Sequence, residues 1–265
     1  MKKILTLILI IPLFIFSSCS DDDGTTQDPK PEMPPQSSMA PNFDNFEDDG
    51  GRIAEITNWT YAATSVGVYS TILYSNLVVP VTAFKVGLNQ EATYESDTEL
   101  WVWEYDVLVA NKGTYNVRLT ADVDGSDVDW TGYVSLDGSF VDFVWFEGES
   151  NLDADAGSWV LYESPETPSP WLSVSWSDDE STGVANSEFT IQKEGDYFGS
   201  SIAYEANANA TYNRGVMIID TNASNTIEVD WNSPSGEGRV KSEAYFQDSA
   251  YHCWDETLND TDCPS

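Results

Sequence analysis

The chain has 265 residues and a formal net charge of −34, because 45 Asp and Glu residues stand against 11 Lys and Arg. Such a charge repels nucleic acid and anionic lipid headgroups, which proteins bind through basic patches. Neutral sugars, apolar small molecules, cations and basic proteins remain as partners. The simplest interpretation of the negative charge is that it keeps the protein soluble.

Residues 1–18 have the pattern of a secretory signal peptide. Met1-Lys2-Lys3 is a positive start, and the apolar segment from Ile4 to Phe16 is too short for a membrane span. Small residues, Ser17 and Ser18, then precede Cys19. The sequence therefore predicts export from the cytoplasm.

The ending of this signal resembles the lipobox of bacterial lipoproteins, although Phe16 stands where Leu is usual. The resemblance implies lipidation of Cys19, which would become the N-terminus of the mature chain. Ser20-Asp21-Asp22-Asp23 resembles the acidic surface-export tag of Bacteroidetes lipoproteins. Together they imply an outer-membrane protein that is anchored through its lipid and faces the cell exterior. A periplasm-facing lipoprotein with an acidic tether is the alternative.

Residues 19–42 are rich in Asp, Pro, Ser and Gln, which predicts a disordered acidic linker. We expect residues 43–265 to form one domain. Its first part, from Asn58 to Phe84, contains no charged residue, but many Ser and Thr residues and Pro80 argue against a membrane span.

The same part predicts a helix from about Arg52 to Ser75 and a second, short helix with Pro80 in its first turn. Because the first helix lacks charges from Asn58 onward, we expect it to be buried on most sides. A pair of strands is the alternative. The apolar residues that recur at helical spacing in the first helix are Ile56, Trp59, Ala63, Val66, Leu73 and Leu77.

Residues 101–146 alternate between apolar and polar side chains across three short turns, which predicts four antiparallel strands. The turns Asn111-Lys112-Gly113, Asp124-Gly125-Ser126-Asp127 and Asp137-Gly138 set the expected register; the last suits a type I′ hairpin. In this register one row on one face holds Trp103, Ala121, Trp130 and Trp145, and Asp122 lies opposite Asp129.

Six further strands are expected between residues 159 and 231, separated by clusters rich in Asp, Gly, Asn and Pro. The predicted fold class is mainly β: an N-terminal helix packed on a long antiparallel meander of about ten strands that curls into an open or closed barrel. This order of elements resembles the half-barrel of lipoprotein-carrier proteins and, more loosely, the lipocalins. This resemblance is one of element order and assigns no function to any residue of the chain.

Two cysteines remain besides Cys19. In an oxidising compartment we expect Cys253 and Cys263 to form a disulfide that pins the C-terminal tail. A zinc site is poorly supported, because His252 is the only histidine.

The second predicted hairpin is the most specific candidate for a metal. Asp122 and Asp129 face each other, and Asp124 and Asp127 lie in or beside the loop between them. Like charges at opposed positions destabilise a strand pair, and Ca²⁺ would relieve the repulsion. A solvated acidic turn is the alternative. We expect no other cofactor.

The aromatic residues allow two interpretations. Trp103, Trp130 and Trp145 form either a filled core beneath the helix or the lining of a cavity for an apolar ligand. Sugar binding would instead use exposed rings, for which the pattern offers Tyr133, Phe140 and Phe146. Trp171, Trp176 and Trp231 are less clearly assigned to a face.

The sequence has no Gly-rich phosphate loop, no nucleophile elbow and no His-based triad. We therefore expect a lipid-anchored binding module without catalytic activity. A carrier of an apolar ligand in a half-barrel cavity and a glycan-binding accessory lipoprotein are the alternatives.

Overall fold

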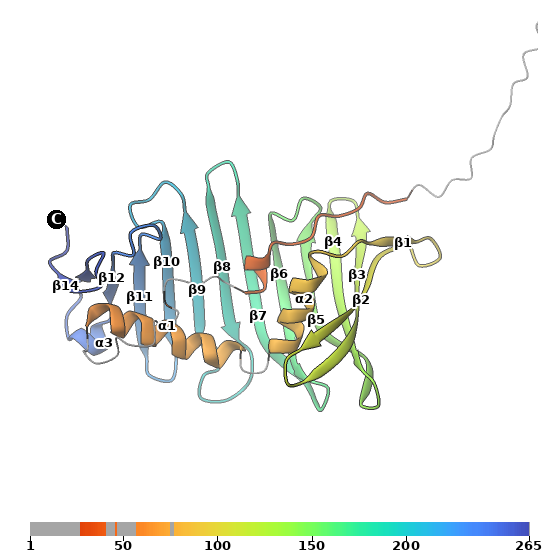
Figure 1. Cartoon of the computed structure of the whole chain (residues 1–265), viewed down its shortest axis with the longest axis horizontal. Coiled ribbons are helices and arrows are strands. Elements are labelled where there is room, and N and C mark those ends of the chain that lie inside the picture. The colour runs from red at the N-terminus through yellow and green to blue at the C-terminus, as the bar shows by residue number, and fades with distance from the viewer. Residues whose placement is uncertain (1–26, 41–45, 47–56, 75–76, 265) are drawn as a thin grey trace, which may run out of the picture.

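A single antiparallel sheet runs the length of the molecule (Figure 1). The computed structural model describes residues 27–40, 46, 57–74 and 77–264. In these residues fourteen strands neighbour one another in chain order, each antiparallel to the next. They are β1 (Thr93–Glu95), β2 (Leu100–Val109), β3 (Gly113–Asp124), β4 (Asp127–Leu136), β5 (Phe140–Asn151), β6 (Ala156–Ser164), β7 (Thr167–Asp179), β8 (Val184–Ile191), β9 (Ser201–Asn207), β10 (Arg214–Asp220), β11 (Asn225–Trp231), β12 (Gly238–Lys241), β13 (His252–Trp254) and β14 (Asp260–Thr261).

The sheet is open, with β1 and β14 as its edges. The prediction of a mainly β fold with an antiparallel meander is confirmed, whereas closure into a barrel is not supported. The expected number of strands was too low, because β1, β12, β13 and β14 are only two to four residues long and show too little alternation to be recognised. Short edge strands also leave few backbone groups free to pair with another chain.

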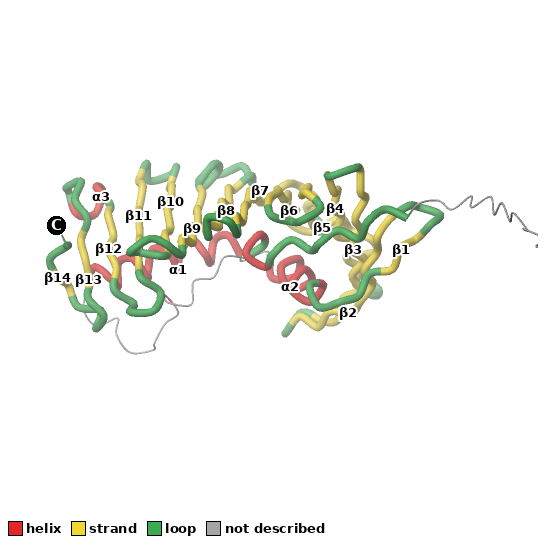
Figure 2. Tube along the Cα trace, turned by 90° about the horizontal axis from the view of Figure 1, so that it is seen from above, coloured by secondary structure: helices red, strands yellow, loops and turns green. Residues whose placement is uncertain are grey.

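Helices α1 (Asn58–Tyr74) and α2 (Val78–Gly87) lie on the same face of the sheet (Figures 1 and 2). We call this the inner face and the opposite one the outer face. Helix α2 packs against β2 and β4, where the sheet curls, and α1 packs against β10, β12 and β13. The 3-10 turn η1 (Gln36–Ser38) contacts β7, and the short helix α3 (Glu243–Phe246) contacts β11.

The two predicted helices are present, and Pro80 lies in the first turn of α2. The expected start near Arg52, together with Ile56, lies outside the described residues. Helix α1 buries one stripe, Trp59, Ala62, Val66 and Tyr69, while Val68 is 49% exposed. Burial on most sides is therefore wrong, because the sheet covers only one side of the helix.

Hydroxyl groups along α1 bond within the helix. Ser65 Oγ, Ser70 Oγ and the exposed Thr71 Oγ1 donate to the carbonyl oxygens of Tyr61, Val66 and Gly67, at 2.8, 2.7 and 2.8 Å. None of the described helices is both long and apolar enough to span a membrane.

Glycines on the inner face make room for large rings on the neighbouring strand. A Cβ added at Gly148 would lie 2.0 Å from the Ser158 carbonyl oxygen and 2.6 Å from the Trp159 ring. The same relation joins Gly132 to Phe146, Gly157 to Trp176 and Gly238 to Trp254. These positions allow aromatic rings to lie flat across the sheet.

The observed register of β2 and β3 differs from the predicted one by two residues. Trp101, not Trp103, pairs with Ala121, and Trp103 pairs with Leu119. The loop is Ala110 to Lys112, because Asn111 adopts the left-handed conformation (φ 61°) and β3 already begins at Gly113. A shift of two residues keeps every side chain on its predicted face.

Between β3 and β4 the prediction is confirmed: Ala121 pairs with Trp130 and Asp122 with Asp129. Between β4 and β5 it is wrong, because two bulges shift the register and Trp130 pairs with Gly148 instead of Trp145. Bulges insert unpaired residues that the alternation of side chains does not reveal.

The segment 27–40 packs on the sheet, although the sequence predicted a disordered linker as far as residue 42. Met39 and Ser38 are buried, at 1% and 0% exposure. Three hydrogen bonds fix the segment: Trp101 Nε1 to the Asp28 carbonyl (3.2 Å), Glu32 N to the Leu152 carbonyl (3.0 Å) and Trp159 Nε1 to Ser38 Oγ (3.1 Å). A segment with few apolar side chains is thus held by polar contacts to buried indoles.

Candidate ligand groove on the outer face

A groove of about 550 Å³ crosses the outer face over strands β7 to β11. Two rows of outward-pointing residues line the groove, and each of the five strands contributes one residue to each row. The first row is Ser175, Glu188, Ala203, Met217 and Glu228, and the second is Ser177, Asn186, Glu205, Gly215 and Asp230. The small residues Ala203 and Gly215 leave the space between the longer carboxylate side chains.

The β7–β9 part of the groove presents free polar groups. Ser175, Asn186, Glu188 and Glu205 are exposed, and the described residues provide no side-chain partner for any of them. A hydroxyl, an amide and two carboxylates are thus available to a ligand.

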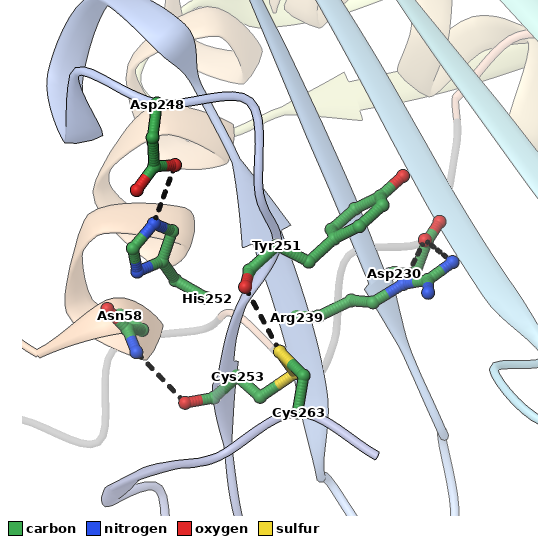
Figure 3. Close-up of a disulfide and its surroundings, with 8 residues drawn as sticks. All are labelled: Asn58, Asp230, Arg239, Asp248, Tyr251, His252, Cys253 and Cys263. Atoms are coloured by element: carbon green, nitrogen blue, oxygen red, sulfur yellow. Dashed lines mark hydrogen bonds and ion pairs between the residues drawn. A yellow bond between two sulfur atoms is a disulfide. The ribbon is translucent and has the colours of Figure 1, made fainter. Parts of the chain in front are cut away.

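The other end of the groove is already organised by ion pairs and aromatic rings, of which Figure 3 shows Arg239 with Asp230 and Tyr251. Arg239 pairs with Asp230 at 2.8 Å, and Lys241 pairs with Glu228 at 2.8 Å. The Arg239 guanidinium lies 4.9 Å from the Tyr212 ring centroid and 3.9 Å from that of Tyr251. Cation–π contacts of this kind hold the rings in place.

These contacts fix the charges in this part of the groove. The hydrogen bond from the Lys241 ammonium and, to a smaller extent, that from the Tyr251 hydroxyl lower the pKa of Glu228. Burial is the main cause that raises the pKa of Tyr251, and the hydrogen bond to Glu228 raises it further. Burial also raises the pKa of Tyr212. At neutral pH Glu228 is therefore ionised and both tyrosines are neutral.

A second hollow of about 470 Å³ adjoins the groove. It shares Glu205, Tyr212 and Asp230 with the groove and extends past Arg239 to the Cys253–Cys263 disulfide. The two hollows are therefore neighbours on the outer face of the sheet's C-terminal half.

The predicted disulfide between Cys253 and Cys263 is present. It ties β13 to the tail and lies beside Tyr251 and the N-terminus of α1 (Figure 3). There, Asn58 Nδ2 donates to the Cys253 carbonyl at 2.9 Å, and the Asn58 backbone N–H donates to the Asp260 carboxylate at 2.7 Å. The other predicted cysteine site, Cys19, lies outside the described residues.

The predicted calcium ligands Asp122, Asp124, Asp127 and Asp129 are all exposed on the outer face. Asp129 also pairs with Glu149 across β5, which extends the row of carboxylates. Within the part of the chain that the structure describes, no group of three or more acidic, His or Cys side chains is placed to hold a metal ion. The four carboxylates are therefore open to solvent, and calcium binding here stays a prediction.

The three tryptophans predicted to line a core or cavity are buried. The ring centroids of Trp103 and Trp130 lie 5.5 Å apart, and the Trp145 ring packs against Tyr115 and Phe143 in the same core. None of the three borders the groove. Their surroundings are those of core residues.

All ten tryptophans of the chain are buried, with exposures of 9% or less. Trp171, Trp176 and Trp231 therefore offer no exposed ring for stacking, and Phe146 is fully buried as well. Tyr133 and Phe140 are half-buried, with Tyr133 beneath Arg118 and Phe140 beside Trp145. The expected exposed aromatic surface is absent at these residues.

Sequence reasoning missed the groove itself. One signal was the set of small outward residues on β7, β9 and β10, which only a correct strand assignment reveals. Another was the clustering of Arg214, Arg239 and Lys241, three of the chain's 11 Lys and Arg residues, near the C-terminus. No protein-family model, curated protein or solved structure matches this chain.

Proposed function

We propose that this protein is a non-catalytic binding module that holds its ligand in the outer-face groove. The supporting observation is that the groove combines free hydrogen-bonding groups with rings and ion pairs already fixed in position. Preorganised groups of this kind bind a ligand at a lower entropic cost.

We further propose that the module is lipid-anchored at Cys19 in the outer membrane and faces the cell exterior. The sequence resemblances support this. Asp28, whose carbonyl oxygen accepts from Trp101 Nε1, follows Cys19 by nine residues, which reach at most about 32 Å when fully extended. The anchor would therefore keep the sheet close to the membrane.

A carrier of apolar ligands is less well supported. Phe84 of α2 packs 5.5 Å from Trp159 and 6.2 Å from Phe146, and the Tyr105 hydroxyl donates to the Ala83 carbonyl at 2.9 Å. Helix α2 thus fills the curl of the sheet where a carrier would hold its cargo.

The test is an array that presents neutral glycans, acidic glycans, basic peptides and apolar peptides. The mature chain should bind one class, and Ala203→Trp, which fills the groove from an outward position, should lose that binding. The matched control is Thr114→Trp, an exposed outward position on β3. Equal binding by wild type and Ala203→Trp, with both folded by circular dichroism, would refute the proposal.

A further inference from the structure

We infer that the ligand of the groove is a neutral, hydroxyl-rich chain: an oligosaccharide without charged groups, laid across strands β7 to β11. The inference rests on the proposed function and specifies its ligand class. It depends on the charge, the hydrogen-bonding groups and the extent of the groove.

Charge disfavours ionic ligands at this site. The unpaired carboxylates of Glu188 and Glu205 repel an anion. A strongly cationic ligand would find more uncompensated carboxylates elsewhere, because Lys241 and Arg239 already neutralise Glu228 and Asp230. In a chain with a net charge of −34, the β11 end of the groove is therefore locally compensated, and Glu188 and Glu205 are its two unpaired carboxylates.

The free groups match the chemistry of sugar hydroxyls. A hydroxyl both donates and accepts, so it can donate to the Glu188 or Glu205 carboxylate and accept from the Asn186 amide. Hydrogen bonds to an ionised acceptor are the stronger ones. The exposed Ser175 hydroxyl adds a group that bonds in either direction.

The floor also suits the apolar side of a sugar ring. Ala203, Gly215 and Met217 carry no polar side-chain atoms, and Met217 is 44% exposed. The Tyr212 ring, held by Arg239, provides an aromatic wall at the C-terminal end. Polar groups on both sides of an apolar strip match a ring with equatorial hydroxyls and an apolar face.

The extent of the groove favours a chain over a single sugar. Five adjacent strands span four gaps, or about 19 Å at the usual spacing between strands. A monosaccharide would occupy only part of this length. Affinity should therefore increase with chain length until the groove is filled.

Isothermal titration calorimetry tests the inference. Cellohexaose, maltohexaose, xylohexaose and mannohexaose are titrated into the mature chain, with the corresponding monosaccharides, hexalysine and a hyaluronan hexasaccharide as comparators. We expect at least one neutral hexasaccharide to bind, and its monosaccharide to bind at least tenfold more weakly. Hexalysine and hyaluronan should not compete.

Two variants test whether the ligand binds in the groove. Glu205→Gln keeps the side-chain shape but removes the charged acceptor, and it should weaken binding about tenfold. Glu149→Gln, the matched change on β5, should leave binding unchanged. Equal effects of the two variants would overturn the placement in the groove.

A failure of the ligand class can be distinguished from a failure of the proposed binding site. If hexalysine or an apolar peptide binds and Ala203→Trp removes that binding, the groove is a binding site but the neutral glycan is wrong. If Ala203→Trp alters the binding of no probe, both the inference and the proposed function fail.

Discussion

The two ends of the outer face use charge in opposite ways. On β3 to β5, Asp122, Asp129 and Glu149 form a row of exposed carboxylates, and none of them makes an ion pair with another described residue. On β11 and β12, Glu228 and Asp230 are each paired with a cation that lies against tyrosine rings. The chain has few cations, and two of them compensate carboxylates at this end.

The inner face is packed in both halves. The curled half is filled by α2 and by the rings of Trp103, Trp130 and Trp159. The half under α1 buries Ile218, Val229 and Trp231, and the disulfide and the hydrogen bond from Asn58 to Asp260 tie its C-terminal end to the helix. We therefore expect the curled half to depend on packing alone and the other half on packing together with these local covalent and polar contacts.

The largest expected effect concerns the curled half. Trp159→Ala removes a fully buried ring and its hydrogen bond to Ser38, and should lower the free energy of unfolding by about 3–5 kcal/mol. Met217→Ala, at an exposed position in the other half, is the control and should cost less than about 0.5 kcal/mol. Urea denaturation measures both. Similar losses in the two variants would mean that the buried Trp159 ring contributes no more than an exposed side chain.

The next effect concerns the disulfide. Replacing Cys253 and Cys263 with Ser opens a loop of sequence separation 10, which should cost about 2–3 kcal/mol. The loop also carries Asp260, whose carboxylate accepts from the N-terminus of α1. Hydrogen exchange should therefore increase in the first turn of α1 and stay unchanged in α2. Equal increases in both helices would refute this local role.

A smaller effect comes from the Glu228–Lys241 pair. Because the folded state lowers the pKa of Glu228, this carboxylate stabilises the fold above its unfolded pKa, and the contribution is lost as pH falls through the folded value. Lys241 has a raised pKa, so its contribution is lost only at alkaline pH. Glu228→Gln should cost about 0.5–1 kcal/mol at pH 7 and nothing at pH 2. A cost that persists at pH 2 would assign the effect to packing instead.

The smallest effect has the opposite sign. Asp129→Asn removes a charge between Asp122 and Glu149 and should stabilise the fold by about 0.2–0.5 kcal/mol at low salt. Added sodium chloride should reduce this gain, because salt screens exposed charges. Thermal unfolding at two salt concentrations measures it, and destabilisation by Asp129→Asn would mean that the carboxylate has a partner.

The sequence predicted side-chain faces better than strand partners. Trp103 was assigned to the correct face but to the wrong partner, because the period of two fixes the face and leaves shifts by two residues open. The conformation of Asn111 and the bulges in β5 decided the pairing. Both are local backbone features with weak sequence signals.

The groove could not be predicted because it joins residues from five strands. Ala203 and Gly215 are unremarkable in sequence, and they lie together only because β9 and β10 pair in the observed register. Likewise, the segment 27–40 looked like a linker because its contacts are backbone and hydroxyl groups bonded to indoles. By contrast, the disulfide followed from the cysteines alone.

The most direct test of the central claim is the salt dependence of ligand binding at the groove. For a neutral hexasaccharide, affinity should change by less than about twofold between 0.05 and 0.5 M sodium chloride, since screening acts on charged partners. Ala203→Trp should abolish the binding at both concentrations. Binding that falls steeply with salt, or that survives Ala203→Trp, would contradict a neutral ligand held in the outer-face groove.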